Sequence, residues 1–203
     1  MTKTMMSLAS AVSLLLAAAA QAQGSAGPAT VPAGAYAIEP VHTQVEFSVL
    51  HLGFTNYGGV FSNASGDLTL DPKSLAAAKL DIAVPVNTVA TTSDKLNEEL
   101  RGAQWLDAQQ YPTMTFHSTK IARTGPTTAD VAGELTLHGV TKPVVLKAQF
   151  VGAGVNPLSK AYTVGFQVTG KIKRSDFGVK TYLPVIGDEV QLNIAAAFEK
   201  KGS

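Results

Sequence analysis

The sequence predicts an all-β fold of eight antiparallel strands, with a short helical insert between the third and the fourth. Three observations support this prediction. Most of the chain alternates apolar and polar residues with a period of two, which is the period of side chains along a strand. Residues of the types Gly, Pro, Asn and Asp bound the alternating segments, as turn residues do. A helical pattern interrupts the alternation in one place, after the third segment.

The N-terminus is expected to be an export signal rather than part of the fold. Lys3 precedes an apolar run of 13 residues from Leu8 to Ala20, and the sequence Ala20-Gln21-Ala22 is typical of a signal-peptide cleavage site. The run is shorter than the roughly 20 residues that a transmembrane helix needs, and a buried core helix is the alternative. The chain then divides into a signal peptide, a flexible leader rich in Gly, Ala and Pro, and one barrel domain, at residues 1–22, 23–34 and 35–200.

Composition and charge argue against several classes of function. Without the signal peptide, the 16 basic residues of the chain lose Lys3 and equal the 15 acidic residues, so no net charge attracts nucleic acid. The chain has no cysteine, and therefore no thiol nucleophile, thiolate zinc site or disulfide. An exported domain that folds without disulfides fits the bacterial periplasm, which is the location we expect.

The first four alternating segments each have one apolar face. They are residues 36–51, 57–70, 78–89 and 113–123. Their in-phase apolar residues are, in order, Val45, Phe47 and Val49; Leu68 and Leu70; Leu80, Ile82, Val84 and Val86; and Met114 and Phe116. Pro85 cannot donate a ladder hydrogen bond, so the third segment is expected at an edge or to contain a bulge.

The last four segments repeat the pattern. They are residues 130–138, 144–152, 161–174 and 188–199. Their in-phase apolar residues are, in order, Leu135 and Leu137; Val144, Leu146, Ala148 and Phe150; Tyr162, Val164, Phe166, Val168 and Ile172; and Val190, Leu192, Ile194, Ala196 and Phe198. His138-Gly139-Val140-Thr141-Lys142 between the fifth and sixth segments predicts a hairpin turn.

Residues 93–110 have a helical pattern instead. Ser93 suits a helix N-cap, Leu96 and Leu100 are four residues apart on one helix face, and Gly102 suits the helix end. Trp105 follows in an irregular apolar stretch. We expect this insert to cover one end of the barrel as a lid or to plug its core.

Eight long strands that each have one apolar face must bury those faces in a sandwich or in a closed barrel. The length of the strands favours a barrel over the short strands of an immunoglobulin-like sandwich. With eight strands, the interior of a barrel is either filled by side chains or holds one small ligand.

Six short motifs stand in a fixed order along the chain. They are His42-Thr43-Gln44-Val45-Glu46-Phe47, Gly59-Val60-Phe61 after His51, Leu106 to Phe116 (LDAQQYPTMTF), Gly133 to Pro143 (GELTLHGVTKP), Arg174-Ser175-Asp176-Phe177-Gly178, and Val185 to Val190 (VIGDEV). In this order the chain resembles the YceI-like family of exported lipid-binding proteins, over roughly Tyr36 to Glu199. The resemblance implies an extended, lipocalin-like antiparallel barrel that holds a long-chain isoprenoid, quinone-like or acyl amphiphile in an internal tunnel, without established catalysis.

Strand phase, the helical insert and this resemblance together predict which side chains contact the ligand. The predicted contacts are Val45, Phe47, Val49, His51, Phe54, Leu96, Trp105, Phe116, Leu137, Phe150, Val164, Phe166, Val168 and Arg174. No catalytic residue, metal ligand or cofactor is predicted beyond a bound isoprenoid, quinone or fatty-acyl lipid.

The two histidines of the first segment do not form a pair. His51 has the same parity as Phe47, whereas His42 has the opposite parity, so the two point to opposite faces unless a bulge intervenes. They are also nine residues apart, about 30 Å in an extended strand. One metal ion cannot bind both. His51 is either a core histidine at a strand end or a polar group that contacts the head of the ligand.

Arg174 continues the apolar face of the seventh segment beyond Ile172. An arginine in that position either pairs with a carboxylate or faces an anionic or carbonyl head group. Asp176, Asp188 and Glu189 are the candidate carboxylates, and pairing is the preferred alternative.

Two other functions remain open beside lipid binding. An outer-membrane barrel has the same period of two, although the helical insert, 7% aromatic residues without paired girdles and the polar C-terminal end argue against it. An enzyme acting on a lipid head group would need a nucleophile and a base, and no such pair or hydrolase motif occurs. We therefore expect a binding protein rather than an enzyme. Its partner would be a hydrophobic small molecule, without nucleic acid or a stable membrane span, and the sequence leaves a homodimer open.

Overall fold

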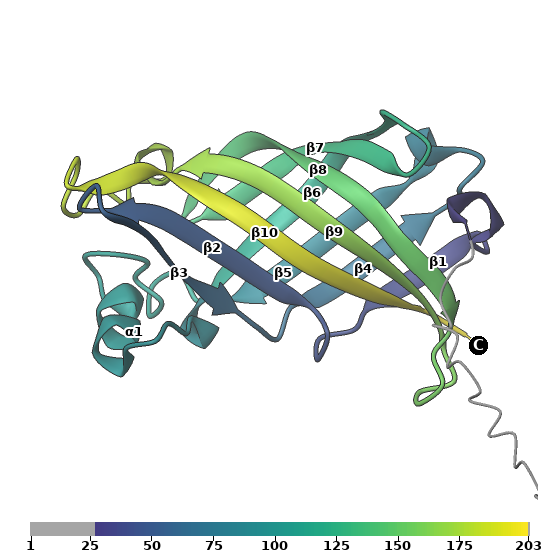
Figure 1. Ribbon diagram of the computed structural model, residues 1–203, viewed down its shortest axis with the longest axis horizontal. Helices are drawn as coiled ribbons and strands as arrows, with labels where there is room; N and C mark the ends of the chain where they lie inside the picture. Colours follow the sequence, from purple (N-terminus) through teal and green to yellow (C-terminus); the bar gives the residue numbers. More distant parts are fainter. Residues whose placement is uncertain (1–26, 203) are drawn as a thin grey trace, which may run out of the picture.

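An antiparallel sheet that closes on itself dominates the computed structural model, which describes residues 27–202 (Figure 1). The predicted signal peptide lies outside the described residues. Ten strands form the sheet within this part of the chain. They are β1 (Gly34–Ile38), β2 (Gln44–His51), β3 (Thr55–Phe61), β4 (Ser65–Leu70), β5 (Lys79–Pro85), β6 (Thr113–Arg123), β7 (Thr128–Leu137), β8 (Val140–Val155), β9 (Tyr162–Lys173) and β10 (Ile186–Lys200).

The barrel closes where β1 pairs with β10. The strands β1, β4, β5, β6, β7, β8, β9 and β10 pair in this order, and the antiparallel β1–β10 ladder returns to the start, so the ring has eight strands. β1 and β2 pair with the same edge of β10 at different places along it. β1 pairs with residues 198–200 of β10, and β2 pairs with residues 186–195, so β2 lengthens the barrel beyond β1. The predicted eight-stranded antiparallel barrel is confirmed.

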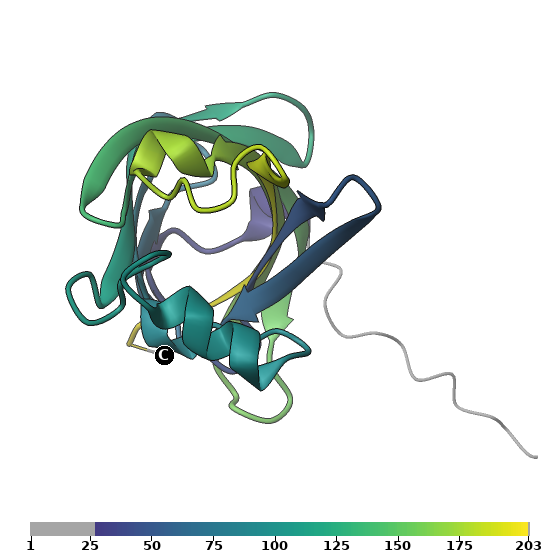
Figure 2. The ribbon, with the colours of Figure 1, turned by 90° about the vertical axis from the view of Figure 1, so that its left-hand side faces the viewer.

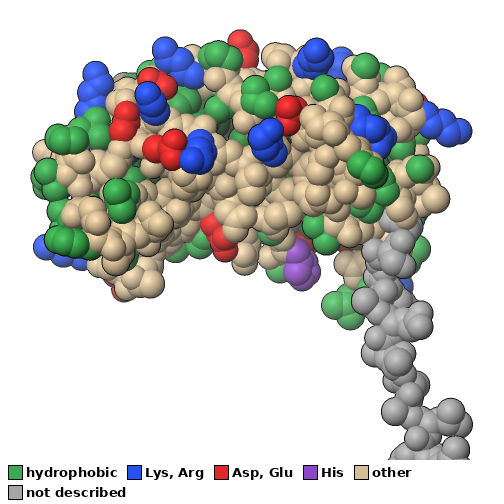
Figure 3. Space-filling view, turned by 45° about the horizontal axis from the view of Figure 1, so that its top comes forward, with side chains coloured by type: hydrophobic (Ala, Val, Ile, Leu, Met, Phe, Trp, Pro, Cys, Tyr) green, Lys and Arg blue, Asp and Glu red, His purple; other side chains and the backbone are tan. Residues whose placement is uncertain are grey.

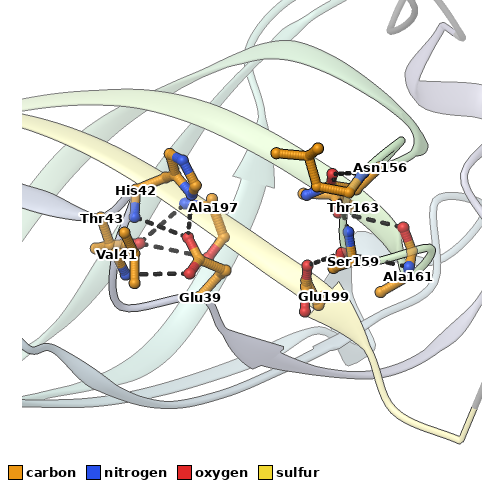
Figure 4. Close-up of polar contacts among 11 residues, drawn as sticks. Glu39, Val41, His42, Thr43, Asn156, Ser159, Ala161, Thr163, Ala197 and Glu199 are labelled. Carbon is orange, nitrogen blue, oxygen red and sulfur yellow. Dashed lines mark hydrogen bonds and ion pairs between the residues drawn. The ribbon is translucent and has the colours of Figure 1, made fainter.

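Two of the expected strands are each interrupted. The first divides into β1 and β2 and the second into β3 and β4, which is why ten strands form a ring of eight. At the first break the Glu39 carboxylate accepts hydrogen bonds from the backbone N–H groups of Val41 and His42, at 3.1 and 2.7 Å (Figure 4). The Thr43 hydroxyl then accepts a hydrogen bond from the backbone N–H of Ala197 on β10, at 3.1 Å. Side chains therefore supply bonds that a continuous ladder would have made.

The helical insert lies between β5 and β6, as predicted. Helix α1 (Asp94–Arg101) begins after Ser93, whose hydroxyl accepts a hydrogen bond from the Leu96 backbone N–H, and ends at Gly102. Asn97 is buried on α1, and its side-chain oxygen accepts hydrogen bonds from the backbone N–H and the hydroxyl of Thr91, at 2.6 and 2.8 Å. The helix lies along one side of the opening at one end of the barrel (Figure 2).

Four short 3₁₀ helices complete the fold: η1 (Pro28–Thr30), η2 (Leu75–Ala77), η3 (Val86–Thr88) and η4 (Arg174–Phe177). η1 lies within the segment expected to be the leader, residues 23–34. Val31, directly after η1, is only 5% exposed, and the Tyr36 hydroxyl donates a hydrogen bond to the carbonyl of Pro32. These apolar side chains have a place in the core, so the described part of the leader belongs to the fold.

The hairpin predicted over His138 to Lys142 is confirmed between β7 and β8, with Val140 to Lys142 already in β8 and the turn itself at His138-Gly139. Both residues have positive φ, 52° and 73°, as a two-residue turn that follows the twist of the strands requires. Two apolar clusters fill the barrel near its ends. One contains Tyr36, Val164 and Phe198, and the other contains Phe61, Leu100 and Phe177 beside α1.

Candidate ligand-binding tunnel

A cavity of about 450 Å³ lies inside the barrel, within the range usual for small-molecule sites. Its lining extends from Pro28 and Val31 beside η1 to Leu96 and Trp105 at the helical insert. It is therefore a tunnel along the barrel. We call its α1 end the mouth, which is lined by His51, Tyr57, Leu96, Trp105 and Tyr182 and faces the viewer in Figure 2.

The tunnel is apolar because the in-phase residues of the strands point inward. Val45, Phe47 and Val49 of β2 line it, whereas their neighbour Glu46 is exposed on the outer face. The inward side chains are half-buried rather than fully buried, since they border the hollow instead of packing against a facing layer. This orientation is the reverse of that in outer-membrane barrels, which turn their apolar face to lipid.

Aromatic rings form part of the wall at two places. Phe166 makes edge-to-face contacts with Phe150 and Phe198, with ring centroids 6.0 and 6.1 Å apart. Nearer the mouth, the rings of Phe47 and Phe61 lie 5.3 Å apart. These rings support one another across β8, β9 and β10 and across β2 and β3, so they give the tunnel a defined shape.

Most of the predicted contact residues line the tunnel. They are Val45, Phe47, Val49, His51, Leu96, Trp105, Phe116, Leu137, Phe150, Phe166, Val168 and Arg174. Phe54 lies elsewhere, because it occupies the β2–β3 turn, where its side chain is 85% exposed. Val164 has the predicted inward phase but is fully buried in the packed cluster with Tyr36, beyond the hollow part of the barrel.

Some lining residues were not predicted. Val190, Leu192, Ile194 and Ala196 of β10 line the tunnel and have the same phase along their strand, so periodicity alone could have identified them. Tyr182 lies between η4 and β10, where no periodic signal exists. Its position depends on the path of the backbone and not on a sequence pattern.

Arg174 is buried behind the mouth, and its partners differ from the expected carboxylate. Its guanidinium donates hydrogen bonds to three backbone carbonyls, those of Gly187, Val179 and Ile186, at 2.9, 3.0 and 2.9 Å. It also lies over the Trp105 ring, 5.4 Å from the centroid. Burial lowers the pKa of this guanidinium, and the charge of Asp188 acts in the opposite direction. Arg174 therefore ties the η4–β10 connection to the insert.

Asp188 bonds to Ser175 rather than to Arg174. The carboxylate accepts hydrogen bonds from the Ser175 backbone N–H at 2.9 Å and from its hydroxyl at 2.7 Å. Burial alone would raise the pKa of Asp188, but these hydrogen bonds and the charges of Arg174 and Lys173 outweigh it and lower that pKa. This pair fixes the start of β10 against η4.

The histidines are separated, as parity predicts. His51 faces the tunnel beside Tyr57, with ring centroids 6.0 Å apart, and among the described residues its ring has no hydrogen-bond partner. His42 lies outside the barrel and contacts Glu39 at 2.7 Å. His117 contacts Asp81, and His138 contacts the Phe177 carbonyl. Within residues 27–202, no three side chains of the types His, Cys, Asp and Glu are grouped to hold a metal ion.

No helix in the described part of the chain is long and apolar enough to cross a bilayer.

Comparison with known proteins identifies the family. Residues 36–198 match the model of the YceI-like domain. A UPF0312 protein of Pectobacterium carotovorum subsp. carotovorum (strain PC1) is 37% identical over 193 residues, which cover 95% of each chain. The crystal structure of Burkholderia cenocepacia BcnA has a TM-score of 0.71 and 25% identity, and the match covers 79% of this chain and 98% of that one.

A second solved structure shares the fold at lower identity. A polyisoprenoid binding domain from Saccharophagus degradans, implicated in plant cell wall breakdown, has a TM-score of 0.59 and 17% identity over 81% of this chain and 98% of that one. The family model spans most of the chain, and the Pectobacterium relative matches along almost its whole length. The chain belongs to the YceI-like family.

Proposed function

We propose that this protein binds a long-chain isoprenoid, quinone-like or acyl amphiphile in its tunnel and acts as a periplasmic carrier or store rather than as an enzyme. The observation that carries the proposal is the tunnel of about 450 Å³, whose wall consists of apolar strand faces. The fold that this protein shares with a polyisoprenoid binding domain supports an isoprenoid as the class of ligand.

The distribution of charge along the tunnel favours a ligand with an apolar tail. In the described part of the chain, the Lys, Arg, Asp and Glu residues on the wall are Glu99 and Arg174 at the mouth and Arg123 at the η1 end. A tail between them meets aliphatic and aromatic side chains. Burial of each CH₂ group contributes about 0.8 kcal/mol, so a long tail would bind tightly without any ionic contact.

We place the polar head of the ligand at the mouth. His51, Tyr57 and Thr91 line the tunnel there, and the His51 ring has nitrogen atoms free of hydrogen bonds to the described residues. The guanidinium of Arg174 already bonds to three carbonyls, so it is less available to a head group. A neutral head that accepts or donates a hydrogen bond would suit this end.

Solvent extraction tests the binding function. The purified protein is extracted with organic solvent, and the extract is analysed by mass spectrometry for long-chain lipids. In parallel, lipid-stripped protein is titrated with an isoprenoid quinone and with a fatty acid. Trp105 is the single tryptophan of the chain and lines the mouth, so its fluorescence reports occupation directly. Absence of both a co-purified lipid and a fluorescence change would rule out the proposal.

The contribution of His51 is tested with two variants. His51→Leu keeps the wall apolar but removes the hydrogen-bonding group. Affinity for the quinone should therefore fall about tenfold, which corresponds to the free energy of one hydrogen bond. Affinity for a hydrocarbon of the same length should not change. His42→Leu is the matched control, because His42 lies outside the barrel. Equal affinities for the quinone in both variants would place the head elsewhere.

A further inference from the structure

Exposed apolar side chains gather beside the mouth, on two connections that are far apart in the sequence. Leu50, Leu52 and Phe54 belong to the end of β2 and the β2–β3 turn, and Tyr182 and Val185 to the η4–β10 connection; we call these five residues the rim. Their exposed fractions run from 47% for Leu52 to 85% for Phe54. Figure 3 shows hydrophobic side chains gathered at the left-hand end, the end that carries α1 in Figure 1.

Hydrogen bonds hold the two connections together as one edge. The Leu52 backbone N–H donates to the Val185 carbonyl at 3.1 Å, and His51 pairs with Ile186 in the β2–β10 ladder. The Tyr182 carbonyl in turn accepts a hydrogen bond from the Ile186 backbone N–H at 2.8 Å. The β2–β10 ladder, which shapes the mouth, therefore also fixes the positions of the rim residues.

One rim residue, Tyr182, connects the rim to the apolar wall of the tunnel. Tyr182 is 65% exposed and also lines the tunnel, where its ring lies 6.1 Å from the Trp105 ring. An apolar chain that leaves the mouth can therefore pass over Tyr182 onto the outer surface without crossing a polar band. The exposed apolar residues at the other end, such as Leu158 on the β8–β9 connection, do not line the tunnel.

The charge of this edge favours an anionic surface. Residues 50–57 and 178–187 contain no Asp or Glu, and they contain one lysine, the exposed Lys180. The acidic residues Glu98 and Glu99 lie on α1, on another side of the opening (Figure 2). Aromatic and aliphatic side chains beside a basic residue are typical of segments that insert into the interface of anionic membranes.

The size of the rim argues against a second protein chain as its partner. A stable protein interface buries about 800 Å² on each side and takes about 20–30 residues of each partner. Five side chains on two narrow connections supply far less. Shallow insertion into a bilayer needs only such a small apolar tip, because the lipid adapts to its shape.

We propose that the rim docks the mouth of the tunnel onto the surface of a bilayer that contains anionic phospholipid, so that an amphiphile can move between bilayer and tunnel. The reason for docking rests on the proposed function, since an apolar cargo must leave a lipid phase to enter the tunnel. Phe54 inserts most deeply, and Lys180 contacts the lipid phosphates.

Vesicle flotation tests the proposal. Lipid-stripped protein is mixed with vesicles of phosphatidylethanolamine and phosphatidylglycerol, and the fraction that floats is measured against lipid concentration. Phe54→Ser should weaken partition about tenfold, because one exposed aromatic side chain no longer inserts. Lys180→Glu should weaken partition on these vesicles and have little effect on neutral phosphatidylcholine vesicles. Leu158→Ser is the matched control, since Leu158 is equally exposed at the other end, and it should float like the wild-type protein.

The outcomes separate this inference from the proposed function. Trp105 fluorescence is used to measure quinone binding by the same variants without vesicles. Phe54→Ser should bind quinone normally, because Phe54 does not line the tunnel. The docking proposal would be overturned if the wild-type protein failed to float, or if Phe54→Ser and Leu158→Ser lost vesicle binding equally. Intact quinone binding in the same experiments would leave the proposed function unaffected. A dimer seen by light scattering that Phe54→Ser dissociates would also overturn it, as the rim would then face a second copy.

Discussion

Arg174, the first residue of η4, has an effect that extends beyond its own element. Its guanidinium bonds to the carbonyls of Val179, Ile186 and Gly187, so one side chain holds the connection that leads into β10. Arg174 continues the inward phase of β9, and it lies on the wall of the tunnel. The sequence could not predict its carbonyl partners, because they depend on how residues 178–187 fold back over the barrel end.

We expect Arg174→Met to destabilise the protein by about 3 kcal/mol, because it leaves buried carbonyls without donors. The free energy of unfolding in urea measures the effect. Arg123→Met is the control, since Arg123 also donates to two carbonyls, those of Pro126 and Pro72, but is exposed. That variant should lose less than about 1 kcal/mol. Equal losses in both variants would mean that burial of Arg174 contributes little.

Asp188 should make stability depend on acid pH. Its pKa is lower in the folded protein than the ordinary value of 3.8, so the stability it contributes is present above that value and is lost as the pH falls through the folded pKa. In Asp188→Asn, and in Ser175→Ala, which removes the hydroxyl hydrogen bond, the decrease in unfolding free energy below about pH 4 should be shallower. Urea unfolding between pH 7 and pH 3 measures this slope.

Glu39 will keep part of that acid dependence in both variants. Burial raises the pKa of Glu39, but hydrogen bonds from His42 and Val41 outweigh it, so this carboxylate also has a lowered pKa. An unchanged slope in Asp188→Asn would contradict the assignment of acid sensitivity to the Ser175–Asp188 pair.

At the scale of the elements, alternation identified the strands and their inner faces, but not where two of them break. Between Glu39 and Thr43 the inward residues change parity, from Tyr36 and Ile38 to Val45 and Phe47. There the Thr43 hydroxyl, rather than a backbone carbonyl, accepts the hydrogen bond of the Ala197 backbone N–H. Hydropathy does not record such a replacement, because it depends on which residues of β10 lie opposite. The helical insert was predictable down to its N-cap, since capping is a local interaction within one turn.

Strand β10 allows a test of the inner face with two adjacent residues. Ala196 lines the tunnel, whereas Ala195 has the opposite phase and pairs with Gln44 and Gln167. Ala196→Phe should fill space that the ligand tail occupies and weaken quinone binding at least about tenfold, the loss of roughly two buried CH₂ groups. Ala195→Phe should bind normally. The fluorescence of Trp105 reports both, and similar affinities would show that the tail lies elsewhere.

At the scale of the whole molecule, the hollow interior should make stability depend on the ligand. A ligand that binds only the folded protein adds about 2.7 kcal/mol at a concentration 100 times its Kd. For a domain of this size, Tm should then rise by roughly 5–10 °C. Differential scanning calorimetry of stripped protein with and without quinone measures the shift. A short-chain quinone, which leaves most of the tunnel empty, is the control and should raise Tm less; no rise with the long chain would contradict tunnel binding.

By itself, the sequence determined the all-β class, the eight alternating segments, the helical insert and the inward face of each strand. These properties are local, because a period of two residues assigns side chains to faces wherever the strand lies. The tertiary structure alone decided that the ring closes through β1 and β10, that the interior remains hollow, that Val164 packs while Val168 lines the tunnel, and that Arg174 bonds to carbonyls. Each of these depends on distances between residues far apart in the chain, which barrel closure sets.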